Sequence, residues 1–184
     1  MNKAEQNETI VLVGFWGIFQ NQIGHNLAEQ LNRPFYDFKE EVENQFLRLP
    51  PSQFDSIGWD EIHHVEEYVF SDLLSRQGSI ISTGSDLVED KNNLITLVES
   101  DAAIIYLHIK HSKSLVKYLA THLYSDYIGE QPVEKILQDY WKFGDEAYRN
   151  ISDLLLETAN KDAAELAHEI ASFITTEVDE DDLF

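Results

Sequence analysis

The sequence predicts a three-layer α/β fold, in which helices cover both faces of a five-stranded parallel β-sheet. Five short runs of β-branched and other apolar residues alternate along the chain with longer segments of helical periodicity. Within the runs, apolar residues stand at successive positions, which is typical of strands that are buried on both faces. The chain has 184 residues, of which 43% are hydrophobic, so it is long enough for one domain with a buried core.

The five expected strands are each marked by such a run and by the residues that bound it. The first is rich in β-branched residues and leads into a glycine, Gly14, and the third runs into a tight turn at Gly84. The fourth is the most apolar stretch of the chain. In chain order, the expected strands cover residues 9–15, 33–37, 78–84, 102–109 and 151–157.

The segments between the strands have apolar residues at helical spacing. Ile23, Leu27 and Leu31 share one face of the first segment. Pro50 and Pro51 end the second, because proline is not tolerated inside a helix. The expected helices cover residues 22–31, 39–47, 59–74, 91–99, 113–124, 133–148 and 162–175.

We expect one domain with a short extension at each end. Residues 1–8 are polar and are expected to be flexible, residues 9–175 form the domain, and residues 176–184 form an acidic tail. The tail is interpreted first as a solubilising segment. Its last two residues, Leu183 and Phe184, follow a run of acids, which resembles the C-terminal peptide of bacterial single-stranded-DNA-binding proteins. Docking of the tail in a basic pocket with an apolar floor is therefore the alternative.

The composition excludes several classes of function. The chain has 34 acidic and 13 basic residues and a net charge of −21, which argues against binding nucleic acid or an anionic membrane by charge attraction. It has no cysteine, which excludes disulfides, thiolate metal sites and cysteine nucleophiles. No apolar run approaches the roughly 18 residues that a membrane span needs, and the polar N-terminus does not have the plan of a signal peptide. We therefore expect a cytoplasmic protein that does not associate with membranes.

The loop after the first expected strand has the position of a phosphate-binding loop, between a strand and a helix, and contains Gly14 and Gly17. A working loop of this kind has a glycine, then a lysine that contacts the β- and γ-phosphates, then a serine or threonine that ligates Mg²⁺. At these three places the chain has Phe19, Gln20 and Asn21. A bulky ring followed by a neutral amide predicts that the loop does not bind phosphate in the usual way.

Four segments of the chain resemble shikimate kinases, which are small enzymes of the P-loop kinase fold. These segments are the first strand with its loop, the first helix with the second strand, the third strand with its turn, and the passage from the sixth helix into the last strand. They cover residues 10–17, 26–37, 80–84 and 147–153, and the similarity extends over residues 9–174. The resemblance implies a three-layer P-loop kinase-like fold and, where the functional residues are kept, phosphoryl transfer from ATP to shikimate.

On the acceptor side, the same resemblance identifies positions that differ from the family's pattern. The family has an Asp-x-Asp after the second strand. Its first aspartate helps to organise Mg²⁺, and its second binds the substrate hydroxyls and assists deprotonation. Asp37 keeps the first, but Lys39, which cannot accept a proton when charged, stands at the second. If Glu66 matches a family glutamate, His63 replaces the arginine that grips the shikimate carboxylate.

Three further family features differ in this chain. The triple glycine that packs against the substrate corresponds to Gly84, Ser85 and Asp86, and the charge of Asp86 would repel an anionic acid. The lid arginine that meets the transferred phosphate must be missing, because residues 77–148 contain no arginine. A second arginine for the substrate carboxylate aligns near Gly144 and is missing for the same reason.

Loss of these groups together predicts a pseudokinase that has no catalytic residues, requires no cofactor and does not bind ATP in the usual way. Because the core strands are intact, we expect the fold to serve as a protein-binding or regulatory module, and the charge favours a basic protein partner. Two alternatives stay open. One is a divergent small-molecule kinase, in which Lys110, Lys113 or Lys117 replaces the missing lysine, and the other is a ligand sensor that uses the former substrate cleft without chemistry.

The first loop also carries four bulky apolar residues in a short stretch, Phe15, Trp16, Ile18 and Phe19. The preferred interpretation is that the ring of Phe19 collapses into the vacated nucleotide cavity. In the alternative, Phe15, Trp16 and Ile18 form an exposed apolar patch that docks a partner.

The helix expected over residues 59–74 contains a group of possible metal ligands, His63, His64, Glu66 and Glu67. Residues three or four apart share one helical face, so His63 can meet either glutamate. A solvated polar face is the preferred interpretation, because no third ligand stands at a convincing spacing, and no metal is expected.

A second histidine pair, His108 and His111, flanks Lys110 after the fourth expected strand. Such a group could form a small basic spot at the edge of the sheet where α/β proteins bind ligands. Ordinary loop polarity is the preferred interpretation.

Overall fold

The computed structural model describes residues 8–15, 19–48, 58–84, 87, 90–110 and 133–179, and within the last range the side chains of residues 141–175. It contains a five-stranded sheet in the order β2-β3-β1-β4-β5, in which all neighbouring strands are parallel. In chain order the strands are β1 (Ile10–Gly14), β2 (Phe35–Asp37), β3 (Ile80–Ser82), β4 (Ala103–His108) and β5 (Leu154–Glu157). The predicted fold class is confirmed.

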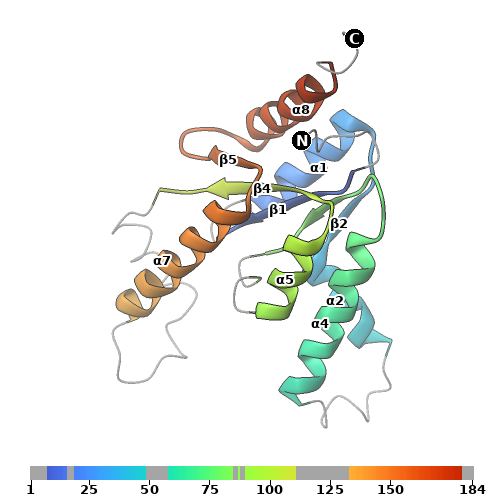
Figure 1. Cartoon of the computed structure of the whole chain (residues 1–184), viewed down its shortest axis with the longest axis vertical. Helices are drawn as coiled ribbons and strands as arrows, with labels where there is room; N and C mark the ends of the chain where they lie inside the picture. The colour runs from blue at the N-terminus through green and yellow to red at the C-terminus, as the bar shows by residue number, and fades with distance from the viewer. Residues whose placement is uncertain are drawn as a thin grey trace.

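Six helices are described around this sheet, and Figure 1 shows them on both of its faces. They are α1 (Gln20–Leu31), α2 (Phe38–Leu47), α4 (Trp59–Leu74), α5 (Lys91–Glu99), α7 (Val133–Ile151) and α8 (Ala163–Asp179). The helix expected over residues 113–124 lies outside the described residues. No helix in the described ranges is long and apolar enough to cross a bilayer.

Alternate residues of the central strand β1 supply the two halves of the core. Ile10 and Leu12 point to one face, where they pack with residues of α1 and α8. Val11 and Val13 point to the other face, where they pack with residues of α2, α4, α5 and α7. This alternation follows from the two-residue repeat of a strand, and burial on both faces explains why the run is apolar throughout.

The predicted boundary between α7 and β5 is wrong. Residues 151–157 were expected to form a strand, but α7 continues to Ile151 and β5 begins at Leu154. The N–H of Ser152 donates to the carbonyl of Tyr148 at 3.0 Å, which continues the helical pattern. Asp153 then makes the turn, and its carboxylate accepts a hydrogen bond from the N–H of Ile104 at 2.9 Å. The apolar pattern could not locate this boundary, because it continues across the turn.

Candidate functional site

The carboxyl ends of β1, β2 and β3 meet at one edge of the sheet, next to the first turn of α1. Parallel strands place the loops that follow them at the same edge, which is where open α/β sheets bind ligands. The register of the β2–β3 pair places Asp37, at the end of β2, next to Ser82, at the end of β3. Gln20 and Asn21 begin α1 beside them.

Gln20 is buried at this edge, and its side chain is bound to backbone. It is 6% exposed, and its side-chain carbonyl accepts a hydrogen bond from the N–H of Gly84 at 3.0 Å. Gly84 has a φ of 80°, a left-handed conformation that favours glycine. The amide of Gln20 therefore ties the start of α1 to the turn that follows β3.

Asn21 joins the ends of two neighbouring strands. Its side-chain carbonyl accepts a hydrogen bond from the hydroxyl of Ser82 at 2.7 Å, and its NH₂ group donates to Oδ2 of Asp37. The other oxygen of Asp37 accepts from the N–H of Lys39 at 2.9 Å and caps α2. Both oxygens of this carboxylate are thus engaged by protein groups.

The two phenylalanines that flank the first loop do not lie as the sequence predicted. Phe19 is 72% exposed at the N-cap position of α1, so the expected collapse of its ring into a cavity is wrong. Phe15 is 1% exposed and stacks on Trp141 with ring centroids 4.9 Å apart, so the alternative of an exposed docking patch is wrong for this residue. The local sequence could not show this, because Trp141 comes from α7 at the far end of the chain.

Several predicted site residues lie outside the described residues. The predictions for them stand untested, and these residues are Trp16, Gly17, Ile18, Ser85, Asp86, His111, Leu183 and Phe184.

His63 lies on α4 and meets two carboxylates. Its Nδ1 is 3.3 Å from Oε2 of Glu66, one turn later on the same helix, and 3.5 Å from Oδ2 of Asp90. Asp90 is the N-cap of α5, where its other oxygen accepts hydrogen bonds from the first turn of that helix. An aspartate directly before a helical segment is a recognisable N-cap signal, but the sequence does not show that α5 begins beside α4.

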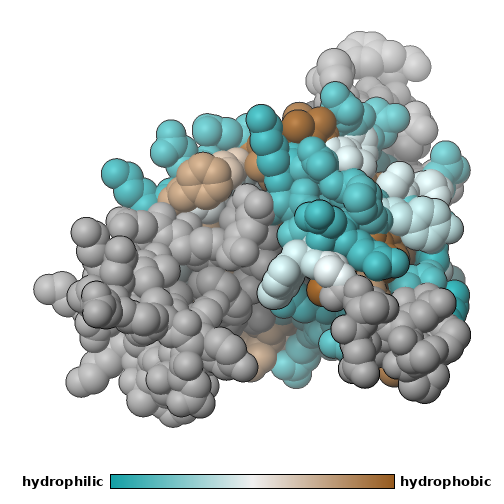
Figure 2. All heavy atoms as spheres, turned by 90° about the horizontal axis from the view of Figure 1, so that it is seen from below, coloured by the Kyte–Doolittle hydropathy of each residue, from teal (hydrophilic) through white to brown (hydrophobic). Residues whose placement is uncertain are grey.

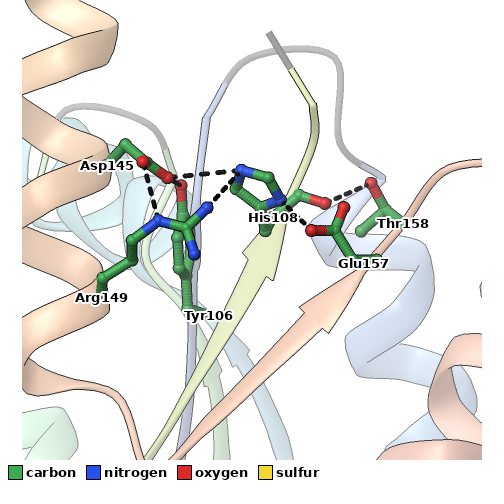
Figure 3. Close-up of polar contacts among 6 residues, drawn as sticks. All are labelled: Tyr106, His108, Asp145, Arg149, Glu157 and Thr158. Atoms are coloured by element: carbon green, nitrogen blue, oxygen red, sulfur yellow. Dashed lines mark hydrogen bonds and ion pairs between the residues drawn. The ribbon is translucent and has the colours of Figure 1, made fainter.

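A second polar cluster lies at the carboxyl ends of β4 and β5, against α7 (Figure 3). His108 is 7% exposed there and has a partner at each ring nitrogen. Nδ1 is 2.7 Å from Oε1 of Glu157, while Nε2 is 2.9 Å from the guanidinium of Arg149 and 3.4 Å from Oδ1 of Asp145. The hydroxyl of Thr158 donates to the backbone carbonyl of His108 at 3.0 Å.

Asp145 is the centre of this cluster on the side of α7. It accepts a hydrogen bond from the hydroxyl of Tyr106 at 2.7 Å and another from Nε of Arg149 at 2.8 Å. Burial raises the pKa of the Asp145 carboxyl, but the hydrogen bonds from Arg149 and Tyr106 outweigh burial and hold the pKa below its usual value. Burial and the bond to Asp145 raise the pKa of the Tyr106 phenol far above its usual value.

The cluster therefore combines two carboxylates, a guanidinium, a phenol and an imidazole. This arrangement is a mixed ionic network rather than a basic spot, although it lies at the predicted edge of the sheet. It joins α7 to β4 and β5, and sequence reasoning missed Asp145 and Glu157 because each comes from a different element than His108. Lys110, two residues after β4, is exposed.

Comparisons with known proteins agree with one another. The family model described as "Shikimate kinase" matches residues 21–175. Shikimate kinase 1 of Salmonella newport (strain SL254) is 27% identical over 165 residues, which cover 90% of this chain and 95% of that protein.

Solved structures of similar proteins have the same fold. A shikimate kinase from Acinetobacter baumannii in complex with shikimate has a TM-score of 0.73 and 26% identity, and the match covers 92% of this chain and 94% of that one. A shikimate kinase from Aquifex aeolicus has a TM-score of 0.69 at 21% identity, with 95% and 98% covered.

Proposed function

This chain belongs to the shikimate kinase family, and from that premise we propose that it is a non-catalytic member that works as a protein-binding or regulatory module. The observation that carries the proposal is the hydrogen bond from the N–H of Gly84 to the side chain of Gln20. Gln20 stands where the family's loop has its phosphate-binding lysine. It is neutral and buried, and it is bound to the protein's own backbone.

Neighbouring groups support the same interpretation. The amide of Asn21 stands at the position of the Mg²⁺-ligating hydroxyl and is bound to Ser82 and Asp37. Asp37, which the family uses to organise Mg²⁺, is already occupied by this amide and by the N-terminus of α2. Binding ATP with Mg²⁺ would require these bonds to break, and no lysine stands in the loop to compensate with a charge-assisted bond.

The residues at the positions of the family's shikimate site also differ from the family's pattern. Lys39 and His63 stand at the positions of the aspartate that assists deprotonation and of a carboxylate-binding arginine. His63 lies between the carboxylates of Glu66 and Asp90. Without a cation bound between them, these two carboxylates would repel an anionic acid that enters here.

The surface offers a region suited to a basic partner. A hollow of about 630 Å³ lies between α2 and α4, with Phe46, Val65 and Tyr68 among its apolar residues and Asp60 and Glu61 among its acidic ones. Figure 2 shows that the described surface on one face of the molecule is mainly hydrophilic. With a net charge of −21, the chain attracts cationic segments from a distance. We propose that a basic segment with an apolar side chain docks in this hollow.

Thermal unfolding with ligands tests the loss of catalysis. The melting temperature of the full chain is expected to stay unchanged with ATP–Mg²⁺, ADP or shikimate, whereas the Acinetobacter baumannii shikimate kinase serves as a positive control. A ligand at 100 times its Kd stabilises a protein by about 2.7 kcal/mol, which such a measurement detects. A saturable rise with ATP–Mg²⁺ would overturn the proposal and favour a divergent kinase. A rise with shikimate alone would favour a ligand sensor.

Charge-neutral variants test the docking hollow. Asp60→Asn combined with Glu61→Gln is expected to weaken capture of a basic partner and to reduce the dependence of binding on salt. The matched control replaces two exposed acids elsewhere, Glu29→Gln with Glu99→Gln, and is expected to bind as the unaltered chain does. Equal loss in both double variants would show that only the net charge matters and would overturn this assignment of the surface.

A further inference from the structure

Three potential metal ligands, two on α4 and one at the N-cap of α5, lie close together. They are Nδ1 of His63, Oε2 of Glu66 and Oδ2 of Asp90. All three atoms lie within 4.8 Å of one another. His63 and Glu66 belong to α4, and Asp90 begins α5, so the group joins two elements that are distant in the chain.

The distances are compatible with a shared metal ion. The separations of 3.3 and 3.5 Å from the imidazole nitrogen to the two carboxylate oxygens exceed the roughly 2.7–2.9 Å of a charge-assisted hydrogen bond. Ligands at about 2.0–2.2 Å from a tetrahedral zinc ion stand about 3.3–3.6 Å apart. Both separations from His63 fall in that interval, and the three ligand atoms lie within 4.8 Å of one another, so they could share one ion.

Other contacts fix the two helices independently of any ion. Oδ1 of Asp90 accepts hydrogen bonds from the N–H groups of Asn92 and Asn93 at 2.8 and 3.1 Å, which leaves Oδ2 directed toward His63. Oε1 of Glu67 accepts a hydrogen bond from the side chain of Asn92 at 2.6 Å. This bond links α4 to α5 next to the cluster. Capping thus holds Asp90 in place, and the bond from Asn92 to Glu67 holds the start of α5 against the turn of α4 that carries His63 and Glu66.

We propose that His63, Glu66 and Asp90 bind a divalent transition-metal ion, with zinc as the best match. One imidazole and two carboxylates form a borderline donor set, which suits Zn²⁺ and Co²⁺ rather than the all-oxygen shells of Mg²⁺ and Ca²⁺. The exposed position of His63 leaves the fourth site open to water or to a side chain of a partner. A bound ion would stabilise the contact between α4 and α5, and this inference does not depend on the absence of kinase activity.

Titration of the full chain with Co²⁺ and Zn²⁺ tests the site. One equivalent of Co²⁺ is expected to bind with the visible absorption of a tetrahedral complex, and Zn²⁺ is expected to displace it, while Mg²⁺ is not. Removing one of three ligands should weaken binding by well over tenfold, because even groups outside the ligand set change metal affinity by about 10–100-fold. His63→Ala and Asp90→Asn are therefore both expected to abolish saturable binding.

Two controls separate metal binding from folding. Asp90→Asn keeps a side-chain oxygen that can cap α5, so its melting temperature without metal should match that of the unaltered chain. His64→Ala removes the neighbouring exposed imidazole and should leave Co²⁺ affinity unchanged. The proposal is overturned if the unaltered chain shows no saturable binding, if His64→Ala loses it as fully as His63→Ala, or if Asp90→Asn binds normally.

Discussion

At the residue scale, Gln20 shows how one side chain at the start of α1 takes part in the structure of the candidate site. Its side-chain carbonyl is the partner of the Gly84 N–H, and the residue is only 6% exposed. The sequence shows only that this position carries a neutral amide where the resemblance places a lysine. It did not predict that the replacing amide would take a structural role, because Gly84 reaches it only through the order of β1 and β3 in the sheet.

Replacing Gln20 should therefore cost stability. We expect Gln20→Ala to lower the free energy of unfolding by about 1–2 kcal/mol, since the Gly84 N–H loses its acceptor in a partly buried setting. Urea denaturation measures this change. Gln22→Ala, an exposed position two residues later on α1, is the control and should change stability by less than about 0.5 kcal/mol. Equal stability of the two variants would contradict a structural role for Gln20.

The Asp145 cluster predicts a specific loss of stability in acid. Hydrogen bonds from Arg149 and Tyr106 hold the pKa of the Asp145 carboxyl below its usual value, so the folded state holds this proton less tightly than the unfolded state does. The stabilisation is present above the unfolded pKa and is lost as pH falls through the lower, folded pKa. We expect Asp145→Asn to flatten the acid limb of a plot of melting temperature against pH below about pH 5.

A second carboxylate provides the comparison for that experiment. Asp101 is exposed and belongs to a loop, so Asp101→Asn serves as the matched surface substitution. If the two variants have the same pH profile, the cluster around Asp145 contributes no more to acid stability than an ordinary surface carboxylate.

At the scale of elements, α1 packs on the edge strand β2 through a glycine. A Cβ atom added at Gly24 would lie 2.2 Å from Cε2 of Phe35 and 2.8 Å from Cδ2, which is closer than atoms can approach. We expect Gly24→Ala to destabilise the protein by about 1–2 kcal/mol, because the cost of overpacking exceeds the roughly 1 kcal/mol that alanine gains in a helix. Chemical denaturation gives the value.

Two further variants make this prediction specific to the contact. Phe35→Leu should restore part of the loss in the Gly24→Ala background, as expected for residues that touch. Gly58→Ala, at the N-cap of α4 with nothing within 4 Å of the added Cβ, should change stability by less than about 1 kcal/mol, since the loss of a good N-cap residue is offset by lower entropy of the unfolded chain. If Phe35→Leu does not restore stability to Gly24→Ala, the contact with Phe35 is not the cause of the loss.

The type of each element was predicted well because apolar residues recur about every 3.6 positions in a helix and form short continuous runs in a buried strand. The apolar runs of β1 and β4 and the helical spacing in α1 and α4 identify each element without tertiary information. The polar contacts were not predictable in this way. Asp90 and Asp145 meet their histidine partners only because α5 packs beside α4 and α7 packs beside β4. Such pairs depend on the placement of whole helices, which local patterns do not encode.

At the scale of the whole molecule, the net charge of −21 makes stability depend on salt. Repulsion among the acids opposes the compact state, and at about 0.15 M salt the Debye length is only about 8 Å. We therefore expect the melting temperature to rise as NaCl increases from about 0.01 M to 0.15 M, where the Debye length falls from about 30 Å to 8 Å. A falling melting temperature over this range would mean that attractive ion pairs, such as that of Arg76 with Asp72, outweigh the repulsion.

The bond between Gln20 and Gly84 also bears on how this loop can change over evolutionary time. Gln20→Lys would introduce the charge that phosphate needs, but it would also remove the acceptor of the Gly84 N–H and place a cation in a buried position. The neighbouring amide of Asn21, bound to Ser82 and Asp37, would still occupy the place of a Mg²⁺ ligand. If the proposed function holds, a gain of phosphate binding would need several substitutions together, and Gln20→Lys alone would lower stability. Each of these hydrogen bonds at the edge of the sheet therefore adds a stability cost to any single substitution that would change the loop.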